Sequence, residues 1–538
     1  MDSVFEQYDQ QLLNAAEDNM ASAFVLLRSF PREYLPHGNE LILQHFSFPR
    51  IAAELAEKYW SNPFYISELL DVAVSFPFQK RAIKTIGMYY TKLYNGGAER
   101  VVCLLSNLLC QAGYRVVIIT DEAPDPRDYF LNDTVVRVVL SGTVPTDGKN
   151  AADRFDRFVR YVRDYEIDAV IYHSWQFFST FWDMCAIKYA GAAFIAHSHN
   201  VFVANTIGMT DVIWRSHSIY RQADAIVTLS ETDRLYWSQF NDRVFAVNNP
   251  ITFKTSDYPA APLNGHSVLW LGRLDSPAKN AEDVLEILHL LLPKVPDVQL
   301  SMVGQIDVAS HRRFSARAEE LGLNGHISFP GYSGNVGHEF QKADVFLVTS
   351  SYEGYPMVLL ESLSSGVPVV CYEMPYLTVV KNSSAIVQVP WKDFRAAADA
   401  LAEILNNSDL RFRMGSEARK EAEAAEKTDL VKCWSDIFRC ITAGCSTKVE
   451  SISPKEFSVF SQTTDLAFKQ MYYAYLKCCS ELYGSKAELS DMRQQLDEKT
   501  SETLRLSAAL GQTQEELRVK TREAIRLRNI LDKWLSAN

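Results

Sequence analysis

One segment of the chain, 350–361, combines residue types that bind phosphate and hydroxyl groups; it reads Ser-Ser-Tyr-Glu-Gly-Tyr-Pro-Met-Val-Leu-Leu-Glu. The short apolar run 345–348 precedes it and predicts a buried strand. Pro356 suits the first position of a helix, because the N–H that proline lacks would have no partner there. A helix that begins at this point directs its backbone N–H groups and the positive end of its dipole at a ligand. The segment therefore predicts a site for a diphosphate.

The side chains of the same segment extend this site. Gly354 lets the backbone approach a ligand closely. Glu353, before the helix, and Glu361, inside it, offer carboxylate acceptors for sugar hydroxyl groups at two separate points. Tyr355 and Met357 flank the proline and are predicted to contact the same ligand. Together these residues predict a site for a sugar joined to a diphosphate.

Two cations follow another predicted strand, 268–271. Gly272 and Arg273 come directly after this strand, and Lys279 lies a short distance further along the chain. The planar fork of Arg273 and the mobile charge of Lys279 can both stabilise a diphosphate that departs with growing negative charge. Two such cations can replace a metal ion, and the sequence has no Asp-x-Asp ligand pair at a strand end. We therefore predict neither a metal nor another cofactor.

A pair of glycines stands at the corresponding place in the first half of the chain. Gly96, Gly97 and Glu99 lie between the apolar run 83–90 and a helical stretch at 98–111. Two adjacent glycines allow a tight turn and a close approach of donor or acceptor to the backbone. An ordinary strand-to-helix turn is the alternative interpretation.

These elements resemble the motifs of retaining glycosyltransferases of group 1, family GT4, which have the GT-B fold. Glu353 and Glu361 are similar to the E-x7-E motif, Arg273 and Lys279 to the G-R-x…K-N element, and the glycine pair to the G-G-x-E loop on the acceptor side. The resemblance spans roughly 83–445 and rests on four motifs at predicted strand ends. It implies transfer of a sugar from a nucleotide-diphosphate sugar to a glycan, lipid-linked or other acceptor. It gives catalytic roles to Glu353, Arg273 and Lys279.

The resemblance also assigns roles at three further strand ends. A catalytic histidine that bonds the sugar's 6-hydroxyl is placed at His199, with His197 as second choice; a histidine that satisfies backbone groups is the alternative. Gly331 and Tyr332 occupy the place that receives the nucleotide base. The segment 373–376, Glu-Met-Pro-Tyr, is similar to a variant in bacterial exopolysaccharide and cell-wall glycan transferases. A role in bacterial polysaccharide or cell-surface glycan synthesis is therefore expected.

The elements that must position these residues alternate between strand and helix, which predicts an α/β fold with two parallel sheets. We expect Rossmann-like domains at 81–247 (acceptor) and 266–450 (donor), joined by a linker at 248–265, with a cleft between the carboxyl ends of their strands. A helical extension is predicted at 1–80 and another at 451–538. The remaining predicted strands are 116–120, 135–140, 169–173, 194–197, 225–229, 244–247, 299–303, 327–329 and 367–371.

A seven-residue repeat of apolar residues begins at Leu482 and continues to Leu531. The repeat predicts a coiled coil, and hence self-association or docking onto a synthesis complex. Its second apolar position is interrupted by Lys499, Thr513 and Lys520. An amphipathic helix that folds back on its own chain is therefore the alternative.

Composition excludes several classes of protein. The net charge of −12 disfavours nucleic-acid binding, which needs a basic surface. No apolar run approaches the roughly 18 residues of a membrane span, and the nine cysteines lack C-x-x-C spacing, so we expect a cytoplasmic protein without disulfides. One predicted helix carries a cation at every third position. This spacing favours a helix face that is exposed to solvent. The alternative is that the face contacts the inner surface of an anionic membrane or a lipid diphosphate. These cations are Arg154, Arg157, Arg160 and Arg163.

Retention of anomeric configuration constrains the mechanism. Double displacement would need a protein carboxylate below the sugar, and no acidic residue near 197–200 suits that role. Attack from the same face as the leaving diphosphate, through an oxocarbenium-like state, is therefore favoured. Two other functions stay open at this point: a non-catalytic GT-B scaffold or regulator that works through the coiled coil, and epimerisation of a sugar nucleotide.

Overall fold

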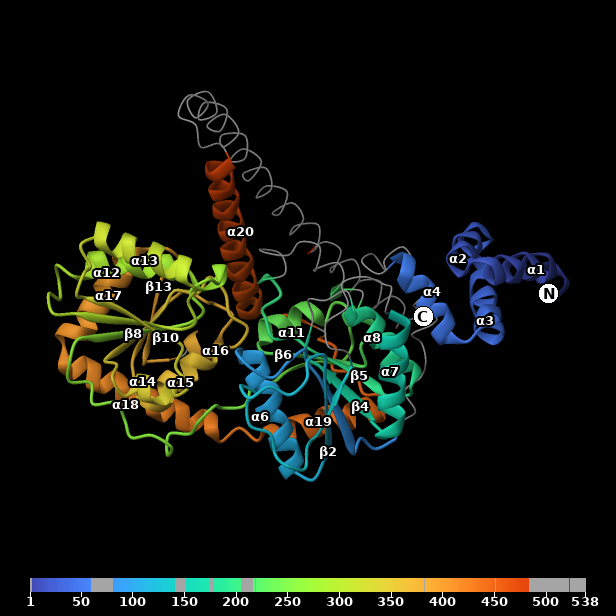
Figure 1. The fold of residues 1–538 in the computed structure, drawn as a ribbon, viewed down its shortest axis with the longest axis horizontal. Helices are drawn as coiled ribbons and strands as arrows, with labels where there is room; N and C mark the ends of the chain where they lie inside the picture. The colour runs from blue at the N-terminus through green and yellow to red at the C-terminus, as the bar shows by residue number, and fades with distance from the viewer. Residues whose placement is uncertain are drawn as a thin grey trace. The chain divides into compact units, whose positions relative to one another are not determined.

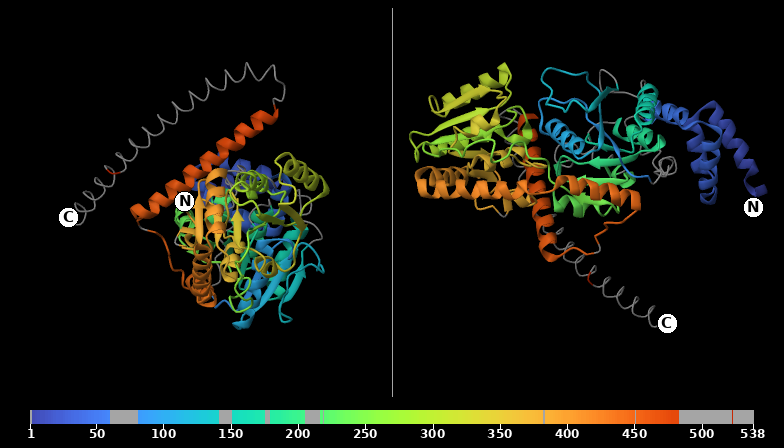
Figure 2. Two further views of the ribbon diagram at one scale, coloured as in Figure 1. Left: turned by 90° about the vertical axis from the view of Figure 1, so that its left-hand side faces the viewer. Right: turned by 90° about the horizontal axis from the view of Figure 1, so that it is seen from below.

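A computed structural model describes residues 2–59, 81–140, 151–174, 179–204, 216–217, 219–381, 383–449, 451–482 and 522. The chain divides into two compact units, Met1–Ala467 and Phe468–Asn538. The first unit contains two parallel β-sheets with helices on both faces of each (Figure 1), and Figure 2 shows the same layers from two further directions. Among the described residues, no helix combines the length and the apolar character that a membrane span requires.

The first sheet has seven strands in the order β3-β2-β1-β4-β5-β6-β7, all parallel. Its strands are short apolar runs buried on both faces, as expected for a sheet covered by helices on each side. They are β1 (Thr85–Tyr89), β2 (Arg115–Thr120), β3 (Val136–Val139), β4 (Ala169–Tyr172), β5 (Ala193–His197), β6 (Ala225–Thr228) and β7 (Val244–Ala246). The predicted strands of this half are confirmed.

The second sheet has six parallel strands in the order β10-β9-β8-β11-β12-β13. Five were predicted; the edge strand β13 (Ile386–Val389), whose apolar run is interrupted by the exposed Gln388, was missed. The others are β8 (Ser267–Leu271), β9 (Gln299–Val303), β10 (Ile327–Gly331), β11 (Val345–Val348) and β12 (Val369–Tyr372). Helices α12 (Ala281–Leu291), α13 (Val308–Glu320), α14 (Val336–Phe340), α15 (Met357–Ser365), α16 (Thr378–Lys381), α17 (Phe394–Asn406) and α18 (Ser408–Glu426) complete this domain.

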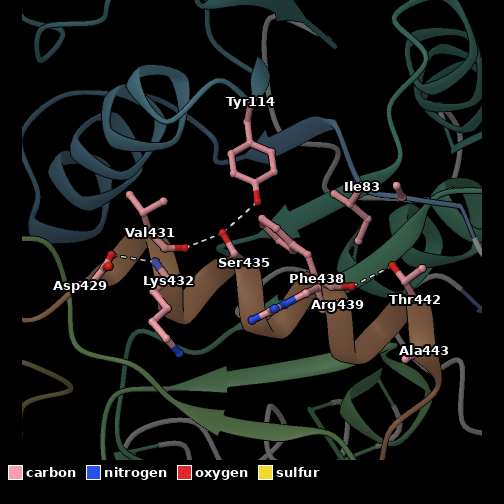
Figure 3. A pocket seen from close by; sticks show the side chains of 11 residues that line it. Ile83, Tyr114, Asp429, Val431, Lys432, Ser435, Phe438, Arg439, Thr442 and Ala443 are labelled. Atoms are coloured by element: carbon pink, nitrogen blue, oxygen red, sulfur yellow. Dashed lines mark hydrogen bonds between the residues drawn. The ribbon is translucent and has the colours of Figure 1, made fainter.

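The chain returns to the first sheet after α18. Helix α19 (Leu430–Ala443) buries Trp434 and Phe438 in the core that lies under β1, β2 and α6 (Gly97–Gln111). On its outer side, Tyr114 of the first domain hydrogen-bonds Ser435, beside an apolar hollow of about 780 Å³ (Figure 3). The sequence boundaries assigned these residues to the donor domain, whereas their packing places them with the first sheet.

The N-terminal extension is helical, as predicted, over its described part. It contains α1 (Asp2–Asp18), α2 (Met20–Ser29), α3 (Leu35–His45) and α4 (Phe48–Tyr59). Helix α4 packs on α7 (Ala151–Asp164) and α8 (Ser179–Tyr189) of the first domain. Near the other end, α20 (Pro454–Leu482) is helical, and the predicted coiled coil from position 482 onward lies almost entirely outside the described residues.

The prediction of a solvated basic face on α7 is wrong for one of its four arginines. Arg154 is only 3% exposed, because its guanidinium donates to both carboxylate oxygens of Asp183 at 2.7 Å and also to Asp121. Tyr89 and Tyr172 donate their hydroxyl groups to these same carboxylates at 2.6 Å. Arg154, the two aspartates and the two tyrosines thus form one hydrogen-bonded network, which makes the burial of the arginine tolerable.

We expect Arg154→Met to lower the free energy of unfolding by about 3–5 kcal/mol, because it leaves two buried carboxylates without their cation. Denaturant unfolding followed by circular dichroism measures this. Arg157→Met on the same helix is the matched control, since the ion pair that the structure describes for Arg157 is with Asp153 at the surface. The loss of this exposed pair should leave the midpoint almost unchanged. Equal effects of the two substitutions would contradict the assignment.

Candidate functional site

The loop between β11 and α15 carries the predicted diphosphate site. Pro356 is the N-cap of α15, with φ −72° and ψ 97°, and Met357 is the first helical residue, so the helix begins one residue later than predicted. Proline has no side-chain acceptor with which to cap the helix, so N–H groups of the first turn remain for a ligand. Tyr355 lies half-buried immediately before this turn. The local geometry therefore suits an anion, as the sequence predicted.

Lys279 and Glu353, predicted separately, form an ion pair in which Nζ lies 2.5 Å from Oε1. Lys279 ends a short 3-10 turn, Pro277–Lys279, whose backbone is tied to the end of β11. The Thr349 hydroxyl donates to the carbonyl of Lys279 at 2.7 Å, and the amide of Asn280 donates to the carbonyl of Thr349 at 2.8 Å. These bonds fix the lysine beside the start of α15.

Tyr376 orients the backbone of Glu353. Its hydroxyl accepts from the Glu353 N–H at 2.8 Å and donates to the Glu353 carbonyl at 2.9 Å. Burial raises the pKa of Tyr376 well above its ordinary value, so the phenol keeps the proton that it donates. The sequence had singled out 373–376 only as a hint about substrate class; its tyrosine instead holds the loop.

Glu361, the second acid of the motif, pairs with a residue that the sequence reasoning missed. Arg100 Nη1 donates to Glu361 Oε1 at 3.0 Å, between helices of the two domains. The Glu361 side chain is 2% exposed, and its burial raises the pKa of the carboxyl, an effect that the charge of Arg100 opposes. Arg100 directly follows the Gly96–Glu99 loop, so its position beside a motif was the available signal.

Gly354 lies directly against the backbone of the other domain. A Cβ placed on Gly354 would lie 1.9 Å from the carbonyl oxygen of His199 and 2.9 Å from Cα of Asn200. Only a residue without a side chain fits between these backbone atoms. The structure therefore brings the predicted donor loop directly against the predicted catalytic histidine.

Three histidines cluster at the carboxyl ends of β4 and β5. His173 Nδ1 lies 2.8 Å from His199 Nε2 and 3.2 Å from His197 Nδ1. Burial holds the pKa of His173 and of His197 well below its ordinary value and lowers that of His199 to about 4, so all three are neutral at pH 7. His173 was missed. In the described part of the chain, these three have ring nitrogens close enough to share one metal ion.

A cavity of about 390 Å³ lies beside Arg273, lined from both domains. Lys92, Arg127 and Glu99 reach it from the first domain, and burial raises the pKa of the Glu99 carboxyl against the opposing charge of Lys92. Gly96 has no side chain to clash with this carboxylate, since a Cβ there would lie 2.0 Å from Glu99 Oε2. The cavity thus carries three cations, Lys92, Arg127 and Arg273, and three acidic residues, Glu99, Asp275 and Asp307.

Two other predicted positions flank this region. The carbonyl of Gly272 packs against Gly304, where an added Cβ would lie 1.7 Å from its oxygen, so Gly304 is a further required glycine. Gly331 ends β10 with φ 83°, and Tyr332 after it is 59% exposed. Gly97 begins α6 and has open space around it. Gly272, Gly304, Gly331 and Tyr332 lie at the carboxyl ends of strands or directly after them, whereas Gly97 lies at the start of the helix that follows β1.

Two family models match the chain on either side of the linker. Residues 95–253 match the model described as Glycosyltransferase Family 4, and residues 258–421 match Glycosyl transferases group 1. A phosphatidyl-myo-inositol mannosyltransferase of Mycobacterium leprae is 26% identical over 378 residues, which cover 66% of this chain and 96% of that protein. A Campylobacter jejuni alpha-1,4-N-acetyl-D-galactosaminyltransferase, named for an acceptor on PP-undecaprenol, is 25% identical, with coverage of 65% and 96%.

A likeness to solved structures supports the fold. The Anabaena protein HepE, solved with UDP and glucose, has a TM-score of 0.55 and 16% identity, over 67% of this chain and 99% of that one. These matches, together with the two facing sheets, define a GT-B glycosyltransferase. The chain belongs to the group 1, family 4 glycosyltransferases.

We expect Gly354→Ala to lower turnover by about tenfold or more, because its Cβ must push the donor loop away from His199, and small displacements at a reacting centre cost large factors in rate. Steady-state sugar transfer measures this. Gly334→Ala, at an exposed glycine with nothing within 4 Å of the added Cβ, is the control and should behave as wild type. Full activity of Gly354→Ala would show that the two loops need not touch.

Proposed function

We propose that the protein is a retaining glycosyltransferase that moves a sugar from a nucleotide-diphosphate sugar to a glycan or lipid-linked acceptor, without a metal ion at the diphosphate. The observation that carries this proposal is the N-terminus of α15, where Glu353, Gly354 and Lys279 meet His199 of the other domain. Helix dipole and cations suit the diphosphate, and the carboxylate suits sugar hydroxyl groups.

Donor binding would exchange partners within existing pairs. The diphosphate competes with Glu353 for Lys279 and also attracts Arg273, while Glu353 becomes available to the sugar. Ribose hydroxyl groups bind Glu361 in competition with Arg100, and the base lies beside Gly331 and Tyr332. Each carboxylate thus keeps a hydrogen-bonding partner before and after binding, which limits the cost of its burial.

The transfer step proceeds on one face of the sugar. The described side chains in contact with the His199 ring are imidazoles, which cannot form the glycosyl ester that double displacement requires, and Glu353 is instead paired with Lys279. The bond from the anomeric carbon to the diphosphate breaks first, and Arg273 and Lys279 stabilise the negative charge that develops. A diphosphate oxygen takes the proton from the acceptor hydroxyl as the new bond forms on the same face.

The acceptor is an anionic, lipid-linked glycan in this proposal. The names of the two relatives specify a phosphatidyl-myo-inositol and a PP-undecaprenol acceptor, and these names support this part of the proposal. Arg160 and Arg163 on α7 are exposed and suit peripheral contact with the inner face of a bacterial membrane. We further propose a cytoplasmic location and self-association or docking through the C-terminal heptads.

At millimolar concentration, UDP or GDP, or a sugar conjugate of one of them, should raise the melting temperature of the wild type. A ligand far above its Kd adds about 3 kcal/mol to the free energy of unfolding. Arg273→Ala and Glu361→Ala should lose most of this shift, because each removes a group that holds the donor. Thermal denaturation with and without nucleotide measures it.

Lys342→Ala provides the control for this experiment, because Lys342 pairs with Glu339 at the surface of the same domain. It should show the wild-type nucleotide shift. If no donor nucleotide stabilises the wild type, or if the shift survives in both site variants, the donor site lies elsewhere.

A further inference from the structure

Strand register places His173 beside His197, because β4 pairs with β5 so that Tyr172 lies opposite Ala196. His199 lies two residues beyond the end of β5, and its ring reaches back to His173. The backbone N–H of His173 donates to the carbonyl of Tyr89 at 3.1 Å. This bond continues the hydrogen bonding of the sheet and fixes the position of the His173 backbone. The His173 ring then lies nearly parallel to that of His199, with centroids 5.1 Å apart.

The cluster is closed on its other side. Trp434 of α19 packs edge-on against His197 with ring centroids 5.5 Å apart, and His173 has no exposed surface. The Nε2 atoms of His173 and His197 are buried and have no hydrogen-bond partner among the described residues. Burying such atoms costs free energy that an apolar residue would not. Stability alone therefore gives no reason for histidine at position 173.

Either histidine can be the donor in the contact between His173 and His199, and the proposal takes the arrangement in which His173 donates. A neutral imidazole has one N–H and one lone pair, and the contact of 2.8 Å joins Nδ1 of His173 to Nε2 of His199. When His173 donates from Nδ1, Nε2 of His199 is an acceptor and the proton of His199 must lie on its Nδ1. Nδ1 is then the ring nitrogen of His199 that remains for a substrate oxygen, and it presents an N–H.

We propose that His173 is a positioning residue for sugar transfer, which holds the His199 ring and its tautomer so that Nδ1–H is presented at the donor loop. This rests on the proposed function, since the donor loop touches His199 through Gly354. His173 itself contacts no substrate and transfers no proton. Its action resembles the way in which a hydrogen bond to one imidazole nitrogen commonly sets the state of the other.

The test compares His173→Asn with His173→Leu in the full-length chain. The side-chain amide of asparagine reaches the position of Nδ1 and keeps a donor there, whereas leucine fills similar space without one. His326→Leu is the control, because His326 is also part-buried and bonds a backbone carbonyl, that of Val298, at the start of β10. Kinetics of sugar transfer and the thermal shift with nucleotide are measured for all four proteins.

We expect His173→Leu to lower kcat by about tenfold or more, with the donor KM and the nucleotide shift unchanged, and His173→Asn to recover most of the loss. Equal losses in both variants, or a change in donor KM alone, would overturn the proposal. So would one equivalent of zinc in the purified wild type, because Nδ1 would then be a metal ligand. Sugar transfer by His326→Leu would support the proposed function independently of the result for the His173 variants.

A readout independent of activity separates the two proposals further. Imidazole ¹⁵N spectra of the wild type should show His199 as the Nδ1–H tautomer, and His173→Leu should shift it towards Nε2–H. An Nε2–H tautomer in the wild type contradicts the role of His173, even if sugar transfer is never observed.

Discussion

The backbone of Gly354 lies against the carbonyl of His199, and no side chain fits between the two domains at this point. In a parallel sheet the carboxyl ends of all strands lie along one edge, so the loops that follow the strands of each domain lie along that edge. Groups from both domains can act on one substrate only where the two sets of loops are in contact. A glycine at the meeting point lets backbone approach backbone, and the positions of Glu353 and of the α15 N-terminus follow from it.

Charge pairing is the second constraint on this cleft. Glu361 is almost fully buried and needs a cation, and Arg100 supplies one from 261 residues earlier in the chain. Lys279 and Glu353 pair in the same way within the donor domain. Because a buried charge without a partner is costly, these two ion pairs stabilise the arrangement of the loops. The proposed donor would have to replace the partner of each carboxylate as it binds.

Much of this arrangement could be predicted from sequence, because its signals are local. Short apolar runs between turn residues predicted twelve of the strands, and two residues from separate motifs, Lys279 and Glu353, form an ion pair in the structure. Their binding of one donor together with Glu361 and Arg273 stays a prediction. Features that depend on distant partners could not be predicted. The spacing of Arg154 matches a solvated helix face, yet in the structure it is buried in ion pairs with two aspartates that lie about 30 residues away in sequence. The position of His173 in the histidine cluster follows from the register of β4 against β5, which the sequence does not reveal.

The anomeric configuration of the product tests the central claim most directly. Full-length protein would be incubated with a nucleotide-diphosphate sugar that stabilises it and with an undecaprenol-diphosphate glycan, and the product would be followed by proton NMR while released nucleotide is counted. The account predicts an α-linkage from an α-donor, with one nucleotide released for each linkage formed. A β-linked product, or nucleotide release without any new linkage, would contradict it.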